Sequence, residues 1–187
     1  MKARNLEQKF SIKKVEDLIL LCKSKRYRFR ERLCQKDIYF HSKNGRLKIR
    51  INDRQESELI LYFRADSRKA RESTYFRLPL KYGMNKLREM LESSNGIIGE
   101  IEKERTVFFY NNIRINIDKV KGLGCFIEFE AHLNQNKSNL DRSLRYVEEL
   151  KRELGIKNSQ AIINSYIDLF MKKRKESSLK RRSDTEI

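Results

Sequence analysis

Charged and apolar residues alternate with a period of two in three short stretches of the chain, and this pattern limits the folds that the chain can adopt. The stretches are Asn5 to Phe10, Arg46 to Ile51 and Ile127 to Ala131. Successive side chains of a β-strand point to opposite faces, so the charged residues of each stretch share one face. A solvated outer face is the ordinary explanation. If helices cover the apolar face instead, the charged face lines a water-filled tunnel inside a closed sheet.

The composition is that of one folded domain that favours anionic ligands. The 187 residues carry a formal net charge of +17, and 39% of them are hydrophobic, which is too apolar for a disordered chain. The cysteines Cys22, Cys34 and Cys125 lack a CxxC or paired-histidine context, so neither a disulfide framework nor a zinc site is predicted. No apolar run reaches the roughly 18 to 20 residues of a membrane span. We therefore expect a cytoplasmic protein without membrane contact.

The remaining pattern predicts eight strands and several helices. Strands are expected over Arg4 to Phe10, Gln35 to His41, Gly45 to Ile51, Glu58 to Arg64, Ser73 to Leu80, Ile97 to Tyr110, Ile113 to Lys119 and Phe126 to Leu133. Helices are expected after a Ser11 cap, over Met84 to Leu91 and Leu140 to Leu154, and from Asn158 or Ser159 to Phe170. Residues 1–170 form the predicted domain. Residues 171–187 are basic and nearly free of apolar side chains, so we expect a disordered tail.

The polar faces of several strands carry both signs of charge. If they all point inward, the tunnel holds Glu7, Glu58, Asp118, Glu128 and Glu130 together with Lys9, Lys48, Arg50, Arg64, Lys103, Arg105 and Arg114. Buried charge is costly unless opposite charges pair, water fills the space or ions bind. Carboxylates on neighbouring strands suit Mg²⁺ or Mn²⁺, and arginine and lysine suit phosphate. The residues therefore predict a site for a metal–polyphosphate complex.

The same residues resemble the CYTH superfamily, the triphosphate tunnel metalloenzymes, which is named for class IV adenylyl cyclase and thiamine triphosphatase. Asn5-x-Glu7-x-Lys9 is similar to its ExExK signature, with Asn5 in place of the first glutamate. Further similar blocks are Gln35 to Phe40, Gly45 to Arg50, Glu58 to Arg64, Thr106 to Asp118, Val120 to Glu130 and Ser165 to Phe170. The resemblance implies an α+β fold, an eight-stranded antiparallel tunnel barrel with flanking helices, which binds a triphosphate together with Mg²⁺ or Mn²⁺.

The resemblance also implies a role for each matching residue. The implied metal ligands are Glu7, Asp118, Glu128 and Glu130. The implied triphosphate ligands are Lys9, Lys48, Arg50, Arg64, Lys103, Arg105 and Arg114. The implied catalytic residues are Glu7, Lys9 and Arg50. The substitution at Asn5 removes one carboxylate from the signature.

Three functions remain open from the sequence. We favour a divalent-metal-dependent hydrolase of inorganic triphosphate, thiamine triphosphate or nucleoside triphosphate. The alternative enzyme is a class IV-type adenylyl cyclase, in which the ribose 3′-hydroxyl of ATP attacks the α-phosphorus. A non-catalytic polyphosphate or RNA binder is the third, suggested by the positive charge and by Asn5. Nucleic acid is expected to contact only the basic tail, which also resembles a nuclear localisation signal, and the protein is expected to be a monomer or homodimer.

Overall fold

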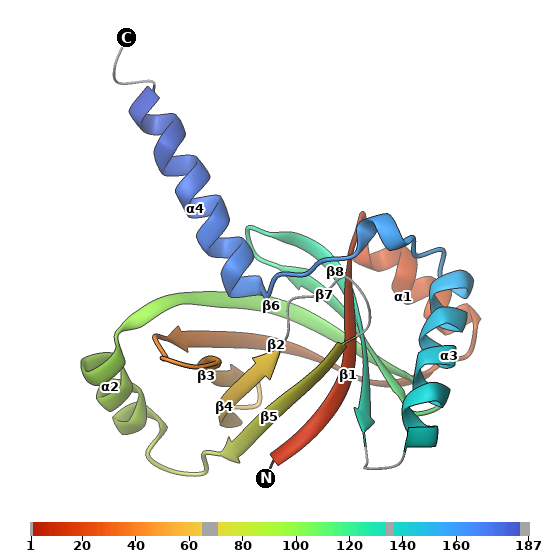
Figure 1. The fold of residues 1–187 in the computed structure, drawn as a ribbon, viewed down its shortest axis with the longest axis horizontal. Coiled ribbons are helices and arrows are strands. Elements are labelled where there is room, and N and C mark those ends of the chain that lie inside the picture. Colours follow the sequence, from red (N-terminus) through yellow and green to blue (C-terminus); the bar gives the residue numbers. More distant parts are fainter. Residues whose placement is uncertain (1, 65–70, 134–136, 184–187) are drawn as a thin grey trace.

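The chain folds into a closed antiparallel barrel. The computed structural model describes residues 2–64, 71–133 and 137–183. The strands are β1 (Lys2–Ile12), β2 (Arg28–Phe40), β3 (Arg46–Asn52), β4 (Ser57–Arg64), β5 (Arg71–Pro79), β6 (Ile97–Tyr110), β7 (Ile113–Val120) and β8 (Gly124–Leu133). They pair in the order β1-β5-β4-β3-β2-β6-β7-β8, and β8 pairs back with β1 (Figure 1). The predicted α+β fold with an eight-stranded antiparallel barrel is confirmed.

Helices cover part of the outer surface of the barrel. Helices α1 (Val15–Ser24) and α3 (Lys137–Glu153) pack on the β7 and β8 side. Helix α2 (Met84–Asn95) packs against β2, and the short 3₁₀ helix η1 (Asn158–Gln160) lies beside β1. The last helix, α4 (Tyr166–Ser183), begins next to β6 and then projects away from the barrel (Figure 1).

The outward-facing apolar residues form the core between strands and helices. Ile115 and Ile117 of β7, with Ile127 and Phe129 of β8, are at most 1% exposed and pack with residues of α1 and α3. Ile49 of β3 is fully buried in a second cluster that includes residues of α2. Each such side chain contributes roughly 1.5 to 3 kcal/mol when it leaves water. Because helices cover the apolar face, the charged face points inward, which confirms the tunnel interpretation.

The turn between β2 and β3 depends on a glycine. Gly45 has a φ of +74°, and a Cβ at this position would lie 2.8 Å from both the Phe63 ring and the Tyr62 carbonyl oxygen. A side chain there is therefore excluded both by backbone conformation and by space. The turn sets the register of the β2–β3 pair, in which Asp37 lies opposite Arg50.

The boundaries of two predicted helices are corrected by the structure. Ser11 does not cap α1, because it pairs with Phe126 within the β1–β8 ladder and the helix begins only at Val15. The last helix does not begin at Asn158 or Ser159, where only η1 forms, but at Tyr166, and it continues to Ser183, beyond the predicted end at Phe170. Lysine, arginine, glutamate and leucine all favour the helix, and no glycine or proline interrupts this range.

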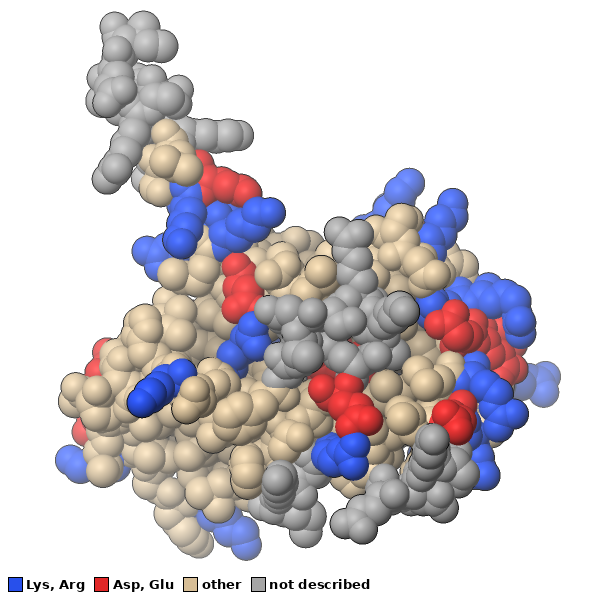
Figure 2. All heavy atoms as spheres, viewed as in Figure 1, with Lys and Arg blue, Asp and Glu red and all other residues tan. Residues whose placement is uncertain are grey.

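The basic residues at the end of the chain lie on this projecting helix. The side chains of residues 172–175, all lysine or arginine, are exposed, and Figure 2 shows basic side chains gathered at the base of α4. Within the described ranges, no helix combines the length and the apolar character needed to cross a bilayer.

Candidate active site

The inward-facing side chains of the barrel enclose a cavity of about 850 Å³. The predicted site residues that line it are Glu7, Lys9, Lys48, Arg50, Glu58, Lys103, Arg105, Arg114, Glu128 and Glu130. Ser165 and Tyr166, at the start of α4, also line it. The barrel therefore brings together residues that are distributed over most of the sequence.

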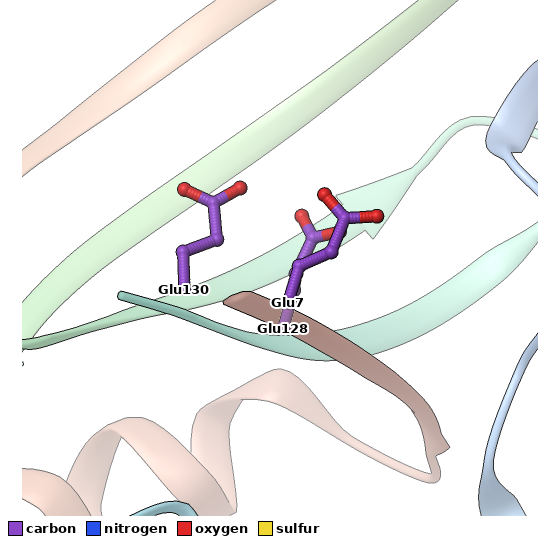
Figure 3. A group of neighbouring side chains, drawn as sticks. All are labelled: Glu7, Glu128 and Glu130. Carbon is purple, nitrogen blue, oxygen red and sulfur yellow. The ribbon is translucent and has the colours of Figure 1, made fainter. Parts of the chain in front are cut away.

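Three carboxylates from two adjacent strands meet in this cavity. Glu7 lies opposite Glu130 in the β1–β8 pairing and Lys9 lies opposite Glu128, so the strand period places the carboxylates on one face. One oxygen of each of Glu7, Glu128 and Glu130 lies within 4.8 Å of the others, and the three side chains rise from the same side of the strands (Figure 3). Burial and repulsion from Glu128 raise the pKa of Glu130. We call these residues the carboxylate trio, whose hard oxygen donors fit Mg²⁺ or Mn²⁺.

Asp118, the fourth predicted metal ligand, lies outside the carboxylate trio. Its oxygens accept hydrogen bonds from Arg105 Nε at 2.7 Å and Nη2 at 2.6 Å, and from the Tyr166 hydroxyl at 2.7 Å. Burial acts to raise the pKa of Asp118, but Arg105 lowers it below its usual value. Both oxygens of Asp118 are thus hydrogen-bonded, and Asp118 orients Arg105. The role of Asp118 as a metal ligand stays a prediction.

A second cluster joins three of the predicted phosphate ligands to one carboxylate. Asp37 Oδ1 accepts a hydrogen bond from Arg50 Nε at 2.7 Å, and Asp37 Oδ2 accepts one from Arg50 Nη2 at 2.8 Å. Lys48 Nζ and Lys103 Nζ also donate to Oδ2, at 2.8 Å and 3.1 Å. We call these four residues the clamp cluster. It presents three cations to the cavity from strands β3 and β6.

The pKa values within the clamp cluster reflect burial and mutual charge. Burial acts to raise the pKa of Asp37, but Arg50, Lys103 and Lys48 hold it well below its usual range. Burial and the neighbouring Arg50 lower the pKa of Lys103 to about 8, although Asp37 acts in the opposite direction. The same two causes lower the pKa of Lys48. Asp37 therefore keeps two buried lysines more protonated than they would be without it.

Three more of the predicted phosphate ligands, Lys9, Arg105 and Arg114, lie beside the carboxylate trio. Arg105 Nη2 lies 3.2 Å from Glu128 Oε2, and Lys9 Nζ lies 3.6 Å from Glu128 Oε1. Arg114 lies opposite Glu130 in the β7–β8 pairing, and its Nε donates to the Asn116 side chain at 3.0 Å. Cations from three strands thus lie next to the trio, and nitrogen donors beside oxygen donors suit a polyphosphate together with a metal.

Glu58 and Asn5, two positions singled out from the sequence, line the cavity but lie outside the carboxylate trio and the clamp cluster. The side chain of Arg64 lies outside the described residues. Glu58 lines the cavity but accepts a hydrogen bond from Arg77 at 2.7 Å. Asn5 lines the cavity near Glu7, and its Oδ1 lies 3.4 Å from His132 Nδ1. An amide therefore stands where the signature has a carboxylate.

Two buried residues of the site were not singled out from the sequence. Asp37 shares one face of its predicted strand with Gln35 and Tyr39, so the strand period could have placed it in the tunnel. Tyr166 comes from α4, and its ring lies 3.9 Å from Lys9 Nζ. No strand pattern applies at the start of a helix, so Tyr166 offered no comparable signal.

The comparisons with known proteins agree with this geometry. A family model described as CYTH domain matches residues 3–166. A Methanocaldococcus jannaschii protein named as a candidate adenylate cyclase is 26% identical over 151 residues, which cover 76% of this chain and 85% of that protein.

Two solved structures have the same fold. A Pyrococcus horikoshii protein has a TM-score of 0.77 at 20% identity, and the match covers 88% of this chain and 98% of that one. A Hippeastrum protein, named as an adenylyl cyclase candidate with a dominant triphosphatase activity, has a TM-score of 0.66 at 13% identity, covering 92% and 96%. At these identities the similarity concerns the fold.

Proposed function

The chain belongs to the CYTH domain family, and from this premise we propose that it is a divalent-metal-dependent hydrolase of inorganic or organic triphosphates. One observation carries the proposal: the carboxylate trio and the cations of the clamp cluster line the same cavity. Such a cavity offers oxygen ligands for a cation and nitrogen donors for a polyphosphate.

The carboxylate trio would hold the divalent cation. Glu7, Glu128 and Glu130 supply oxygens within 4.8 Å of one another. When bound, Mg²⁺ or Mn²⁺ supplies Lewis-acid polarisation of a phosphoryl oxygen. Lys9 and Arg105, which both contact Glu128, hold this carboxylate in place between them.

The cations of the clamp cluster bind and orient the triphosphate. Arg50 offers a planar guanidinium, and Lys48 and Lys103 offer ammonium groups, all anchored on Asp37. Because these donors are fixed before the substrate arrives, they stabilise negative charge that develops on the phosphoryl oxygens with little reorganisation. Arg105 and Arg114 extend the same function towards the carboxylate trio. Water is the proposed nucleophile: it attacks the terminal phosphorus, the bond from that phosphorus to the bridging oxygen breaks, and the remaining diphosphate leaves.

An adenylyl cyclase is the second candidate, and two observations favour it. The Methanocaldococcus jannaschii relative is named as an adenylate cyclase candidate. The cavity of about 850 Å³ is also within the range of roughly 300 to 1,000 Å³ found for organic ligands. In this reaction the ribose 3′-hydroxyl attacks the α-phosphorus and pyrophosphate leaves, so the same donors would hold the leaving group.

Product analysis separates these activities. The protein is incubated with tripolyphosphate, thiamine triphosphate and ATP in Mg²⁺ or Mn²⁺, and phosphate, pyrophosphate and cyclic AMP are measured. We expect phosphate release from at least one substrate, and Glu128→Gln, purified in the same way, controls for contaminating phosphatases. Cyclic AMP with equimolar pyrophosphate would establish the cyclase instead. Tight triphosphate binding without any turnover would contradict both enzymes and establish a binding protein.

A further inference from the structure

Asp37, the carboxylate at the centre of the clamp cluster, does not line the cavity. Asp37 is fully buried, and the hydrogen bonds from Lys48, Arg50 and Lys103 occupy both of its oxygens. We propose that Asp37 is a positioning residue, which fixes these three cations in place and in their charged form for the triphosphate; the proposal rests on the proposed function of the cavity.

The position of Asp37 shows that it acts through other residues. The side chains of Lys48, Arg50 and Lys103 line the cavity, whereas Asp37 lies behind them at 0% exposure. An anion such as a triphosphate would also be repelled by a free carboxylate at short range. Asp37 therefore orders the donors and does not bind the substrate.

Because the clamp cluster is buried, Asp37 affects the protonation of Lys48 and Lys103 as well as their positions. Without a carboxylate, two ammonium groups and a guanidinium would face one another in a region of low dielectric constant, which favours loss of a proton from the lysines. The charged and titratable groups that face Lys48 and Lys103 are Asp37, Arg50, Arg105, Asp118, Tyr39, Tyr62 and Tyr166. Asp37 is the carboxylate hydrogen-bonded to both lysines.

The proposal predicts a pH dependence with a definite sign. The pKa of Lys103 is about 8 with Asp37 present. In Asp37→Asn the amide keeps the shape but lacks the negative charge, so the pKa of Lys103 falls below its native value. As the pH rises from 6 to 8, a larger share of Lys103 is then neutral in the variant than in the wild type, and this share must take up a proton before it can bind phosphate. The loss of affinity therefore grows as the pH rises.

The first test measures binding of inorganic tripolyphosphate by calorimetry, without divalent metal, between pH 6 and pH 8. We expect Asp37→Asn to lose about tenfold more affinity at pH 8 than at pH 6, since each pKa unit corresponds to a factor of ten. Asp168→Asn is the matched control, because Asp168 also pairs with an arginine, Arg46, at 2.7 Å, and it should show no additional pH dependence. An Asp37→Asn loss that is the same at every pH would overturn the proposal.

The second test measures the side-chain pKa values of Lys48 and Lys103 directly and needs no bound substrate. Lysine side chains are labelled with ¹³C and ¹⁵N, and the resonances of Lys48 and Lys103 are assigned by substitution and titrated by NMR. We expect both pKa values to fall in Asp37→Asn. If this variant does not fold, Asp37→Asn is combined with Lys103→Met, which removes one charge of each sign. The pKa of Lys48 should then be lower in the double variant than in Lys103→Met alone, because Asp37 raises it in the native chain.

The two tests separate the positioning role from the proposed function. Unchanged lysine pKa values in the available variant would overturn the role of Asp37, whatever the protein binds. If the wild type bound no tripolyphosphate at any pH, this result would contradict the triphosphate site itself. The lysine titration would in that case still decide whether Asp37 sets the charge of the cluster.

Discussion

Replacing Glu130 by glutamine tests whether the carboxylate trio binds a divalent metal. The substitution removes one negative charge and keeps the shape of the side chain. In the metal-free protein, two carboxylate oxygens within 4.8 Å of each other repel by roughly 3.5 kcal/mol at an effective dielectric constant of about 20. Lys9 and Arg105 contact Glu128 and offset part of this repulsion. We therefore expect metal-free Glu130→Gln to melt at the same temperature as the wild type or a few degrees higher.

The same substitution has the opposite effect on metal binding. We expect the affinity for Mn²⁺ to fall at least about tenfold, because even the loss of a residue that supports a metal ligand weakens binding by about 10- to 100-fold. At a Mn²⁺ concentration of about 100 times the wild-type Kd, binding stabilises the fold by about 2.7 kcal/mol, and a tenfold weaker site leaves about 1.4 kcal/mol. At roughly 2 to 4 °C per kcal/mol, the Mn²⁺-induced rise in Tm falls from about 5–11 °C to about 3–6 °C.

Thermal melts followed by circular dichroism, with and without Mn²⁺, check both effects at once. Glu58→Gln is the matched control: it makes the same chemical change in the same cavity, but Glu58 pairs with Arg77 and lies outside the carboxylate trio. Its Mn²⁺-induced rise should equal that of the wild type. An undiminished rise in Glu130→Gln would refute metal binding by the trio, and a lower melting temperature of the metal-free variant would refute the repulsion argument.

Three further substitutions or deletions test other parts of the site. Arg50→Ala should weaken triphosphate binding by about 10- to 100-fold, because it removes a charged hydrogen bond to phosphate. Initial rates of the variant should not recover at high Mn²⁺, and recovery would make Arg50 part of the metal site. Deletion of residues 171–187 should keep turnover within about tenfold, or 1.4 kcal/mol of barrier, because no described cavity residue lies there. A greater loss would show that the part of α4 beyond Phe170 also contributes to the site. Asn5→Glu should raise Mn²⁺ affinity in a calorimetric titration, because it adds a carboxylate on the Glu7 face; unchanged affinity would place residue 5 outside the metal's reach.

In β3 and β8 the period-two alternation predicted correctly which residues face the tunnel, because this property is local to each strand. Lys48 and Glu128 line the cavity, whereas Ile49 and Ile127 are fully buried on the other side of their strands. The backbone geometry of a β-strand fixes this relation once the strand exists. No knowledge of the neighbouring strands is needed.

The pairing of charges inside the tunnel could not be predicted in the same way. Lys103 and Asp37 are 66 residues apart, and their contact depends on the β2–β6 register, which contains two irregularities. Asp118 and Glu128 both follow the alternation, yet Asp118 lies directly opposite Arg105 in the β6–β7 pairing and becomes its partner. Register, and not strand periodicity, therefore decides which carboxylate lies directly opposite which cation.

Under the proposed function, the balance of charge inside the tunnel would link metal and triphosphate binding. The described site contains the cations Lys9, Lys48, Arg50, Lys103, Arg105 and Arg114 and the carboxylates Glu7, Asp37, Asp118, Glu128 and Glu130. These nearly cancel, although the whole chain carries a net charge of +17. A triphosphate alone would bring several uncompensated negative charges close to the carboxylate trio, and a divalent cation at the trio would relieve this repulsion. Because binding free energies are linked reciprocally, each ligand must then strengthen binding of the other by the same factor.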